Sequence, residues 1–220
     1  MNIKLIHLLS DPLSEREVRS INCTTSLAEF GIHRVEMINP KWVGEVPGGH
    51  LCSDGDSSLN EGRYGCWKAH RDAILKHLDN VDGLIICEAD CLFSVPTNEV
   101  YRRIEVAIRA CREGNLTAFT FGFRHNGKTI DHVGQEVIVI NQWIGTECYF
   151  IPIGSKQIFI ELFSLPWDAY DLLITRNLCD LQKRRIGTFS DRPIAVQANG
   201  VSLITGGTNT FEDHFINTRY

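Results

Sequence analysis

Two patterns missing from this 220-residue sequence exclude whole classes of protein. None of the eight cysteines forms a C-x-x-C pair, the usual pattern of a structural zinc site. No apolar segment approaches the roughly 20 residues that cross a bilayer, and Lys4, His7 and Ser10 interrupt the apolar N-terminus before it could act as a secretory signal. We therefore expect a cytoplasmic protein with no transmembrane segment, no zinc, and cysteines that are mostly reduced and buried.

Concentrated positive charge is also missing. The formal net charge is -5, and the basic residues are scattered apart from the run 183–185, which we interpret as a solvated helix end. Nucleic acid is therefore not an expected partner. The hydrophobic content of 43% is ordinary for a globular protein, and with no linker or internal repeat it predicts one domain over residues 1–220. Residues 200–220, rich in Gly, Thr and Asn, are expected to form a flexible closing segment.

Strands and helices alternate along the chain. Apolar runs predict strands, and amphipathic stretches with capping residues predict helices. The expected strands are 3–9, 33–38, 83–90, 116–123, 137–140, 147–151 and 193–196. The expected helices are 15–30, 62–77, 97–111, 155–163 and 168–181, with a long loop over 39–60. This succession predicts an α/β fold, a mixed sheet flanked by helices.

The apolar run that begins at Gly83 ends in two acids, Glu88 and Asp90. In an extended chain these two side chains point to the same side, while Ala89 faces away. α/β sheets place their chemistry at the carboxyl ends of their strands, and an acid-x-acid pair there suits a divalent cation that carries a diphosphate. The alternative interpretation is that the pair only begins a solvated loop.

Two blocks of sequence carry a family resemblance. Residues 62–70, GRYGCWKAH, followed by 84–90, LIICEAD, resemble the G-x-x-G-C-x-x-S-H and hydrophobic-E-D-D signature of glycosyltransferase family 25, the lipopolysaccharide and collagen galactosyltransferase group. Residues 145–152, 154–156 and 165–168 are similar to that family's G-T-x-A-Y-L-I, G-A and P-x-D run. The first strand and the Ser-Glu-Arg of residues 14–16 resemble its opening strand and arginine-bearing helix. Ala89 replaces the middle acid of the signature, and Ala69 replaces its serine.

The resemblance implies a GT-A (Rossmann-like) fold and an inverting, metal-dependent transfer of glucose or galactose from a UDP-sugar. It implies Mn²⁺ or Mg²⁺ as the cation and leaves the acceptor open between a glycan, a lipid-linked molecule and a protein. The donor-binding residues that it implies are Leu8, Ser10, Arg16, Arg63, His70, Glu88, Ala89 and Asp90. The metal-binding residues that it implies are Asp90, Glu88 and His214. His70 has a structural role as its alternative, and His214 an ordinary surface position.

Asp90 is the leading metal ligand, because a cation there would neutralise the charge that develops on the departing phosphate. An inverting displacement also needs a base on the opposite side of the sugar. Asp168, which follows Pro166 and Trp167, is the leading candidate, and Asp171, one turn later, could substitute. Asp168 could also cap the helix that we expect to begin there, and the two roles can coexist.

Two other functions stay open at the level of sequence. A nucleotidyltransferase or sugar-phosphate enzyme would use the same acid-x-acid metal chemistry, although residues 8–12, LLSDP, are not the Gly-rich phosphate loop that such enzymes normally carry. A non-catalytic carbohydrate-binding protein of the same fold is the third possibility. The acids at 88, 90 and 168 argue against it, and activity decides.

Overall fold

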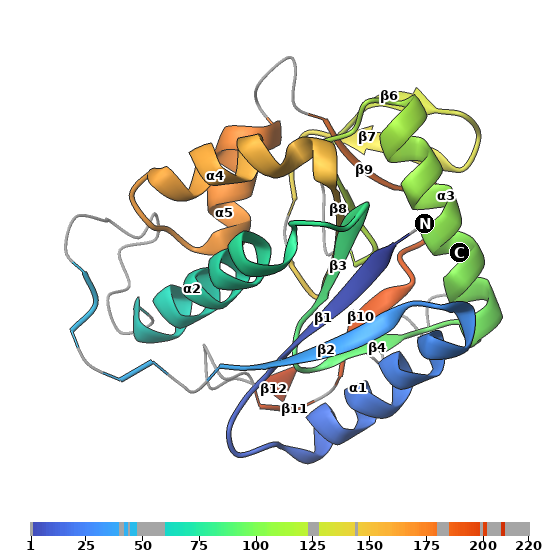
Figure 1. Cartoon of the computed structure of the whole chain (residues 1–220). Helices are drawn as coiled ribbons and strands as arrows, with labels where there is room; N and C mark the ends of the chain where they lie inside the picture. Colours follow the sequence, from blue (N-terminus) through green and yellow to red (C-terminus); the bar gives the residue numbers. More distant parts are fainter. Residues whose placement is uncertain are drawn as a thin grey trace.

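The computed structural model describes residues 2–39, 42–43, 45–47, 60–122, 128–143, 145–179, 185–198, 200–201 and 208–209. Its centre is an eight-stranded sheet with the order β2-β1-β3-β8-β5-β9-β7-β6 (Figure 1). The strands of this sheet are β1 (Ile3–Leu9), β2 (His33–Ile38), β3 (Gly83–Cys87), β5 (Ala118–Thr120), β6 (Thr129–Val133), β7 (Val137–Ile140), β8 (Cys148–Pro152) and β9 (Ile186–Phe189). Two small sheets join β4 (Cys91–Phe93) to β10 (Ala195–Gln197) and β11 (Gly200–Val201) to β12 (Thr208–Asn209).

Helices connect most of these strands. The α-helices are α1 (Glu15–Thr25), α2 (Asn60–His77), α3 (Thr97–Glu113), α4 (Lys156–Ser164) and α5 (Tyr170–Ile174). Short 3-10 turns are η1 (Ser26–Phe30) and η3 (Ile153–Ser155), and α5 runs into a π-helical turn, η4 (Thr175–Cys179). Among the described residues, no helix has the length and apolar character that crossing a membrane requires.

The sheet is mixed, as the sequence predicted. β1 pairs in parallel with β2 and β3, and β5 pairs in parallel with β9. β8 lies between β3 and β5 and runs antiparallel to both. The predicted fold class, an α/β mixed sheet flanked by helices, is therefore confirmed, and it is consistent with a GT-A or Rossmann-like arrangement.

Each face of the sheet has its own apolar core. Figure 1 shows α2, α4 and α5 gathered on one side of the sheet and α1 and α3 on the other. The alternation of β3 separates the two cores: Leu84 and Ile86 belong to the core with α2, while Ile85 and Cys87 belong to the core with α3. Successive residues of an extended strand point to opposite faces, so Cys87 and the residue after it enter different surroundings.

The order of the first three strands creates a switch point. The chain runs from β1 through α1 to β2, then through α2 to β3, which lies on the other side of β1. The carboxyl ends of β1 and β3 are therefore neighbours, with His7 opposite Cys87 in the parallel register. In α/β sheets, ligands bind outside the strand ends at such a point. The acids that follow β3 occupy this position.

Several predicted boundaries were wrong. The helix expected over 15–30 is α-helical only to Thr25 and tightens into η1, although Gly31 ends it as predicted, with a φ of 76°. Five strands were missed: β4, β6 and β9, of three to five residues each, and β11 and β12, of two residues each. β9 contains Gly187, where an added Cβ would lie 2.5 Å from Leu116, so close packing and not β propensity selects that glycine. Most of the loop expected over 39–60 lies outside the described residues.

Candidate active site

Glu88 follows β3 at the switch point and is held from several sides. Its backbone N–H donates to the carbonyl of Glu147, 2.9 Å away, just before β8. Its carboxylate accepts a hydrogen bond from the Thr146 hydroxyl, and its Oε1 lies 3.2 Å from Nε2 of His70. The side chain remains 22% exposed. Glu88 is thus oriented by its neighbours and still reaches solvent.

His70 lies in α2 with only 1% of its surface exposed. Its ring stacks on Tyr170, with the ring centroids 4.4 Å apart, and its Nδ1 lies 2.7 Å from the Tyr149 hydroxyl. Tyr149 in turn donates its hydroxyl proton to Tyr170 across 3.1 Å. Two aromatic residues from β8 and α5 therefore fix the plane of the imidazole and direct its Nε2 toward Glu88.

Asp90 is buried, at 4% exposure, and is bound to the segment that contains β10. Its Oδ2 accepts a hydrogen bond of 2.9 Å from Gln197, and its backbone carbonyl accepts one of 2.7 Å from the N–H of Ala198. Ala89 between the two acids is half-buried. The predicted acid pair thus begins a tightly bound turn, not a solvated loop.

Cys66 in α2 is affected by the charge of three acids. It precedes His70 by four residues, so both lie on the same side of α2. Burial raises the pKa of the Cys66 thiol well above its ordinary value, and the negative charges of Glu88, Asp171 and Asp90 raise that pKa further. Three carboxylates from two separate parts of the chain are therefore close enough to one thiol to act on it.

Asp168 and Asp171 differ in their surroundings. Asp168 is 2% exposed, and its Oδ2 pairs with the guanidinium of Arg176 at 2.5 Å. Ala169, not Asp168, is the N-cap of α5, so the interpretation of Asp168 as a helix cap is wrong. Asp171 is half-buried in the first turn of α5 and belongs to the carboxylates whose charge reaches Cys66. Asp171 therefore lies on the same side of the sheet as Glu88 and Cys66.

The predicted donor residues at the end of β1 have structural partners. Leu8 is 6% exposed and packs in the core beneath α2. The Ser10 hydroxyl donates to the carboxylate of Glu17, 2.6 Å away, and Ser14 and Glu17 form the capping box that begins α1. Although burial alone would raise the pKa of Glu17, these serine hydrogen bonds hold it below its ordinary value. Only the backbone of Arg16 is described, in the first turn of α1.

Two further residues were predicted to bind the donor or the metal, and only one of them is among the described residues. Arg63 is half-buried in α2, two turns before His70. His214 lies outside the described residues, as does most of the segment 200–220 that was expected to be flexible.

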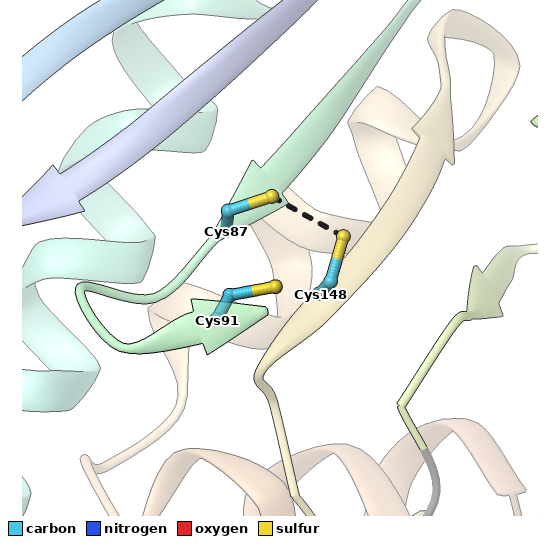
Figure 2. Close-up of side chains that lie close together, drawn as sticks. All are labelled: Cys87, Cys91 and Cys148. Carbon is cyan, nitrogen blue, oxygen red and sulfur yellow. Dashed lines mark hydrogen bonds between the residues drawn. The ribbon is translucent and has the colours of Figure 1, made fainter. Parts of the chain in front are cut away.

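Two groups of side chains among the described residues could hold a metal ion. The His70 cluster consists of Cys66, His70 and Glu88, whose ligand atoms all lie within 4.8 Å of one another. The three-cysteine cluster consists of Cys87, Cys91 and Cys148, with the same limit. Figure 2 shows its three sulfurs pointing toward one another from β3, β4 and β8, and the Cys87 and Cys148 sulfurs are 3.2 Å apart.

Sequence reasoning missed the residues that orient the acids. Thr146, Tyr149 and Tyr170 contact Glu88 or His70 across long stretches of chain, and Gln197 holds Asp90 across 107 residues. Thr146 and Tyr149 lie in the family-like block 145–152, but no local pattern shows that they contact Glu88 and His70. Cys66 and His70 did carry a signal, because a spacing of four places both on one face of a helix.

No protein-family model and no curated protein matches this sequence. Among solved structures, the chain is similar to a glycosyltransferase involved in the glycosylation of the major capsid of PBCV-1, with 9% identity, 75% of this chain and 67% of that chain covered, and a TM-score of 0.42. A197 from STIV has 11% identity, coverage of 93% and 98%, and a TM-score of 0.44. Mannose-1-phosphate geranyltransferase from Thermus thermophilus has 8% identity, coverage of 89% and 76%, and a TM-score of 0.43. Similarity at this level does not establish a function for the chain.

Proposed function

We propose that this protein is an inverting, cation-dependent glycosyltransferase that moves glucose or galactose from a UDP-sugar to an acceptor hydroxyl. The observation that carries the proposal is the place of Glu88 and Asp90, directly after β3 where the carboxyl ends of β1 and β3 meet, with Asp171 on the helix that packs against α2. A cation that screens these carboxylates would favour the approach of a diphosphate. The same cation would neutralise the charge that develops on the departing nucleotide.

The donor set fits a divalent ion. Glu88 is partly exposed and already oriented by Thr146 and His70, so it can turn a carboxylate oxygen toward an ion without first losing conformational freedom. Asp90 lies two residues away, with one oxygen bound to Gln197. In this proposal, Glu88 and Asp90 bind and orient the cation, and the β10 segment keeps Asp90 in position.

Asp171 is the proposed base. It lies on the helix that packs against α2, on the same side of the sheet as Glu88, and its half-buried carboxylate can accept a proton from an acceptor hydroxyl. Asp168, the first candidate from the sequence, is engaged by Arg176 in this structure. We therefore assign Asp168 the role of holding Arg176 and the start of α5.

Donor binding tests the proposal directly. Thermal shift and calorimetry with UDP-glucose, UDP-galactose and other nucleotide sugars, each with Mn²⁺ and with chelator, should show binding of a UDP-sugar that needs the cation. Asp90→Asn should abolish that dependence together with turnover. Asp79→Asn is the matched control, because Asp79 is an exposed acid that pairs with Lys156 on the amino-terminal side of β3. Equal donor affinity in chelator and in Mn²⁺ would contradict the proposal.

The released product separates the proposal from its rivals. Glycosyl transfer or donor hydrolysis releases UDP, whereas a nucleotidyltransferase releases pyrophosphate from a nucleoside triphosphate. Both can be measured with coupled assays on the same preparation. Binding of a UDP-sugar without any release of UDP, in the presence of candidate acceptors, would identify a non-catalytic binding protein.

A further inference from the structure

The His70 cluster combines three kinds of ligand atom. Cys66 offers a sulfur, His70 an imidazole nitrogen and Glu88 a carboxylate oxygen, all within 4.8 Å of one another. Cys66 and His70 are four residues apart on one rigid helix, and Glu88 is fixed at the end of β3. Such a mixed sulfur, nitrogen and oxygen set suits a borderline ion such as Zn²⁺, while Mg²⁺ and Mn²⁺ favour oxygen ligands.

Hydrogen bonds fix the plane of the His70 ring and the partner of each of its nitrogens. Nδ1 lies 2.7 Å from the hydroxyl of Tyr149, which donates its proton to Tyr170, and Nε2 lies 3.2 Å from Oε1 of Glu88. Because Nδ1 is turned to Tyr149, Nε2 is the nitrogen that faces Glu88. A cation between Nε2 and Oε1 would replace the hydrogen bond that joins them with coordination.

The charges of the cluster also match a divalent ion. Zn²⁺ displaces the proton of the Cys66 thiol into solvent, and the resulting thiolate and the Glu88 carboxylate together carry two negative charges, which the ion cancels. This balance matters because His70 is almost fully buried and a net charge there would be costly. Three protein ligands leave a fourth position of a tetrahedral ion open, the arrangement of catalytic rather than structural zinc sites.

We propose that Cys66, His70 and Glu88 bind a Zn²⁺ ion, with Tyr149 orienting His70 as a residue of the outer shell. The site itself does not depend on the reaction that the protein catalyses. The further step, that the open position takes an oxygen of the donor diphosphate, rests on the proposed function. The transferase then binds Zn²⁺ through Cys66, His70 and Glu88, in place of the Mn²⁺ or Mg²⁺ that Glu88 and Asp90 would hold.

Cobalt substitution tests the site without any assay of activity. Protein freed of metal by chelator is titrated with Co²⁺, and one equivalent should produce a sulfur-to-cobalt charge-transfer band together with visible bands of a tetrahedral ion. Zn²⁺ should remove both bands stoichiometrically. Cys66→Ser should lose the charge-transfer band and weaken zinc binding by about 100-fold or more, since even an outer-shell loss costs about 10- to 100-fold.

Two cysteine variants serve as controls. Cys148→Ala removes a sulfur from the three-cysteine cluster, the other group able to supply thiolates, and Cys23→Ser changes a half-buried thiol in α1. Both should keep the band at one equivalent, and circular dichroism verifies that every variant is folded. A band that survives in Cys66→Ser, or that disappears in Cys148→Ala, overturns the assignment, as does failure to bind Co²⁺ and Zn²⁺ at micromolar concentration.

The same preparations separate this inference from the proposed function. Zinc bound through Cys66, with no nucleotide sugar binding under any condition, leaves the metal site standing and removes the transferase. Cation-dependent binding of a UDP-sugar, with no thiolate band for cobalt, leaves the transferase standing and removes the Cys66 ligand.

Discussion

The two sides of β3 differ in chemistry at the point where the strand ends. On one side, the His70 cluster mixes sulfur, nitrogen and oxygen, and Glu88 opens it to solvent. On the other, the three-cysteine cluster has sulfur alone, with no member more than 1% exposed. Burial raises the pKa of the Cys148 thiol well above its ordinary value, whereas at Cys87 the hydrogen bonds with Cys148 and Cys91 outweigh burial and lower the pKa. The three sulfurs are therefore one another's partners, in a pocket of the core that solvent does not reach. Both clusters have three ligand atoms, so that number does not distinguish a binding site from a packed core. Exposure to solvent and a mixture of ligand atom types do.

The largest expected effect is on the rate of transfer, from a change on the side of β3 that carries the His70 cluster. Asp171→Asn should keep UDP-sugar binding and reduce transfer by roughly two to four orders of magnitude, the usual scale for losing a general base. The measurement is the rate of UDP release beside the calorimetric affinity for the donor. Asp168→Asn is the companion variant, and it should lower the urea midpoint of unfolding, because it breaks the pair with Arg176. Normal transfer by Asp171→Asn, with inactive but folded Asp168→Asn, would return the base to Asp168.

Tyr149→Phe sharpens the comparison at the outer shell. The change keeps the ring but removes the hydroxyl that hydrogen-bonds Nδ1 of His70, so the imidazole loses a partner that orients it. Cation affinity should fall by about 10- to 100-fold. Tyr101→Phe, which changes a tyrosine of α3 that stacks on Phe30, should leave the affinity as it is. Equal affinities in the two variants would show that Tyr149 does not orient the site.

On the thiol side the effect should be on stability alone. Cys148→Ala leaves a small void among fully buried residues and should lower the free energy of unfolding by about 1 kcal/mol, with donor binding and transfer unchanged. Urea unfolding and the UDP-release assay measure the two quantities on one preparation. A large loss of transfer with an intact fold would contradict the view that this cluster is only core.

The smallest expected effect is a pH dependence on the thiol side. Burial lowers the pKa of His7, which contacts Ser20 and Thr24 of α1 through its two ring nitrogens. The charged or titratable groups that act on it are Cys87, Arg34 and Glu36. The unfolded chain takes up this proton near pH 6.5 and the folded chain only below it, so stability is present above pH 6.5 and is lost as pH falls.

Between pH 7 and pH 6 this single group should cost under about 1 kcal/mol. His7→Gln cannot titrate, so its free energy of unfolding, measured in urea at both pH values, should change less than that of the parent chain. Identical changes in the two proteins would mean that His7 does not contribute.

Local pattern explains what the sequence could predict. The apolar run before Glu88 placed the acids correctly at the carboxyl end of β3. The strand expected over 83–90 ends at Cys87, however, and residues 88–90 form a turn, so the period-two alternation does not apply to Glu88 and Asp90 and the expectation that rested on it was wrong. The same reasoning failed for the start of α5, because Ala169 takes the cap position and Asp168 turns to Arg176. The expectation of no zinc rested on the absence of C-x-x-C pairs, a pattern that does not include a cysteine and a histidine four residues apart on a helix.

No local pattern predicts which distant residues contact one another to complete the site. Thr146 and Tyr149 meet Glu88 and His70 only because β8 inserts antiparallel between β3 and β5. The order of strands in the sheet depends on the packing of both of its faces. Short strands such as β5, with three residues, have too little pattern to predict that order.

The placement of β8 also sets an order of events during synthesis and folding. Cys87 and Cys148 face each other across 61 positions of sequence, whereas β1, α1 and β2 are consecutive. Closing so long a loop is slow compared with forming the consecutive unit, so we expect β8 to pair with β3, and β3 to pair with β1 across 80 positions, only after β1, α1 and β2 have formed. A nascent chain that has not yet reached residue 148 carries Glu88 and Asp90 without the tyrosine that orients His70. Such a chain has both acids but cannot bind the cation in the proposed geometry. It gains the ability to bind the cation only when β8 pairs between β3 and β5.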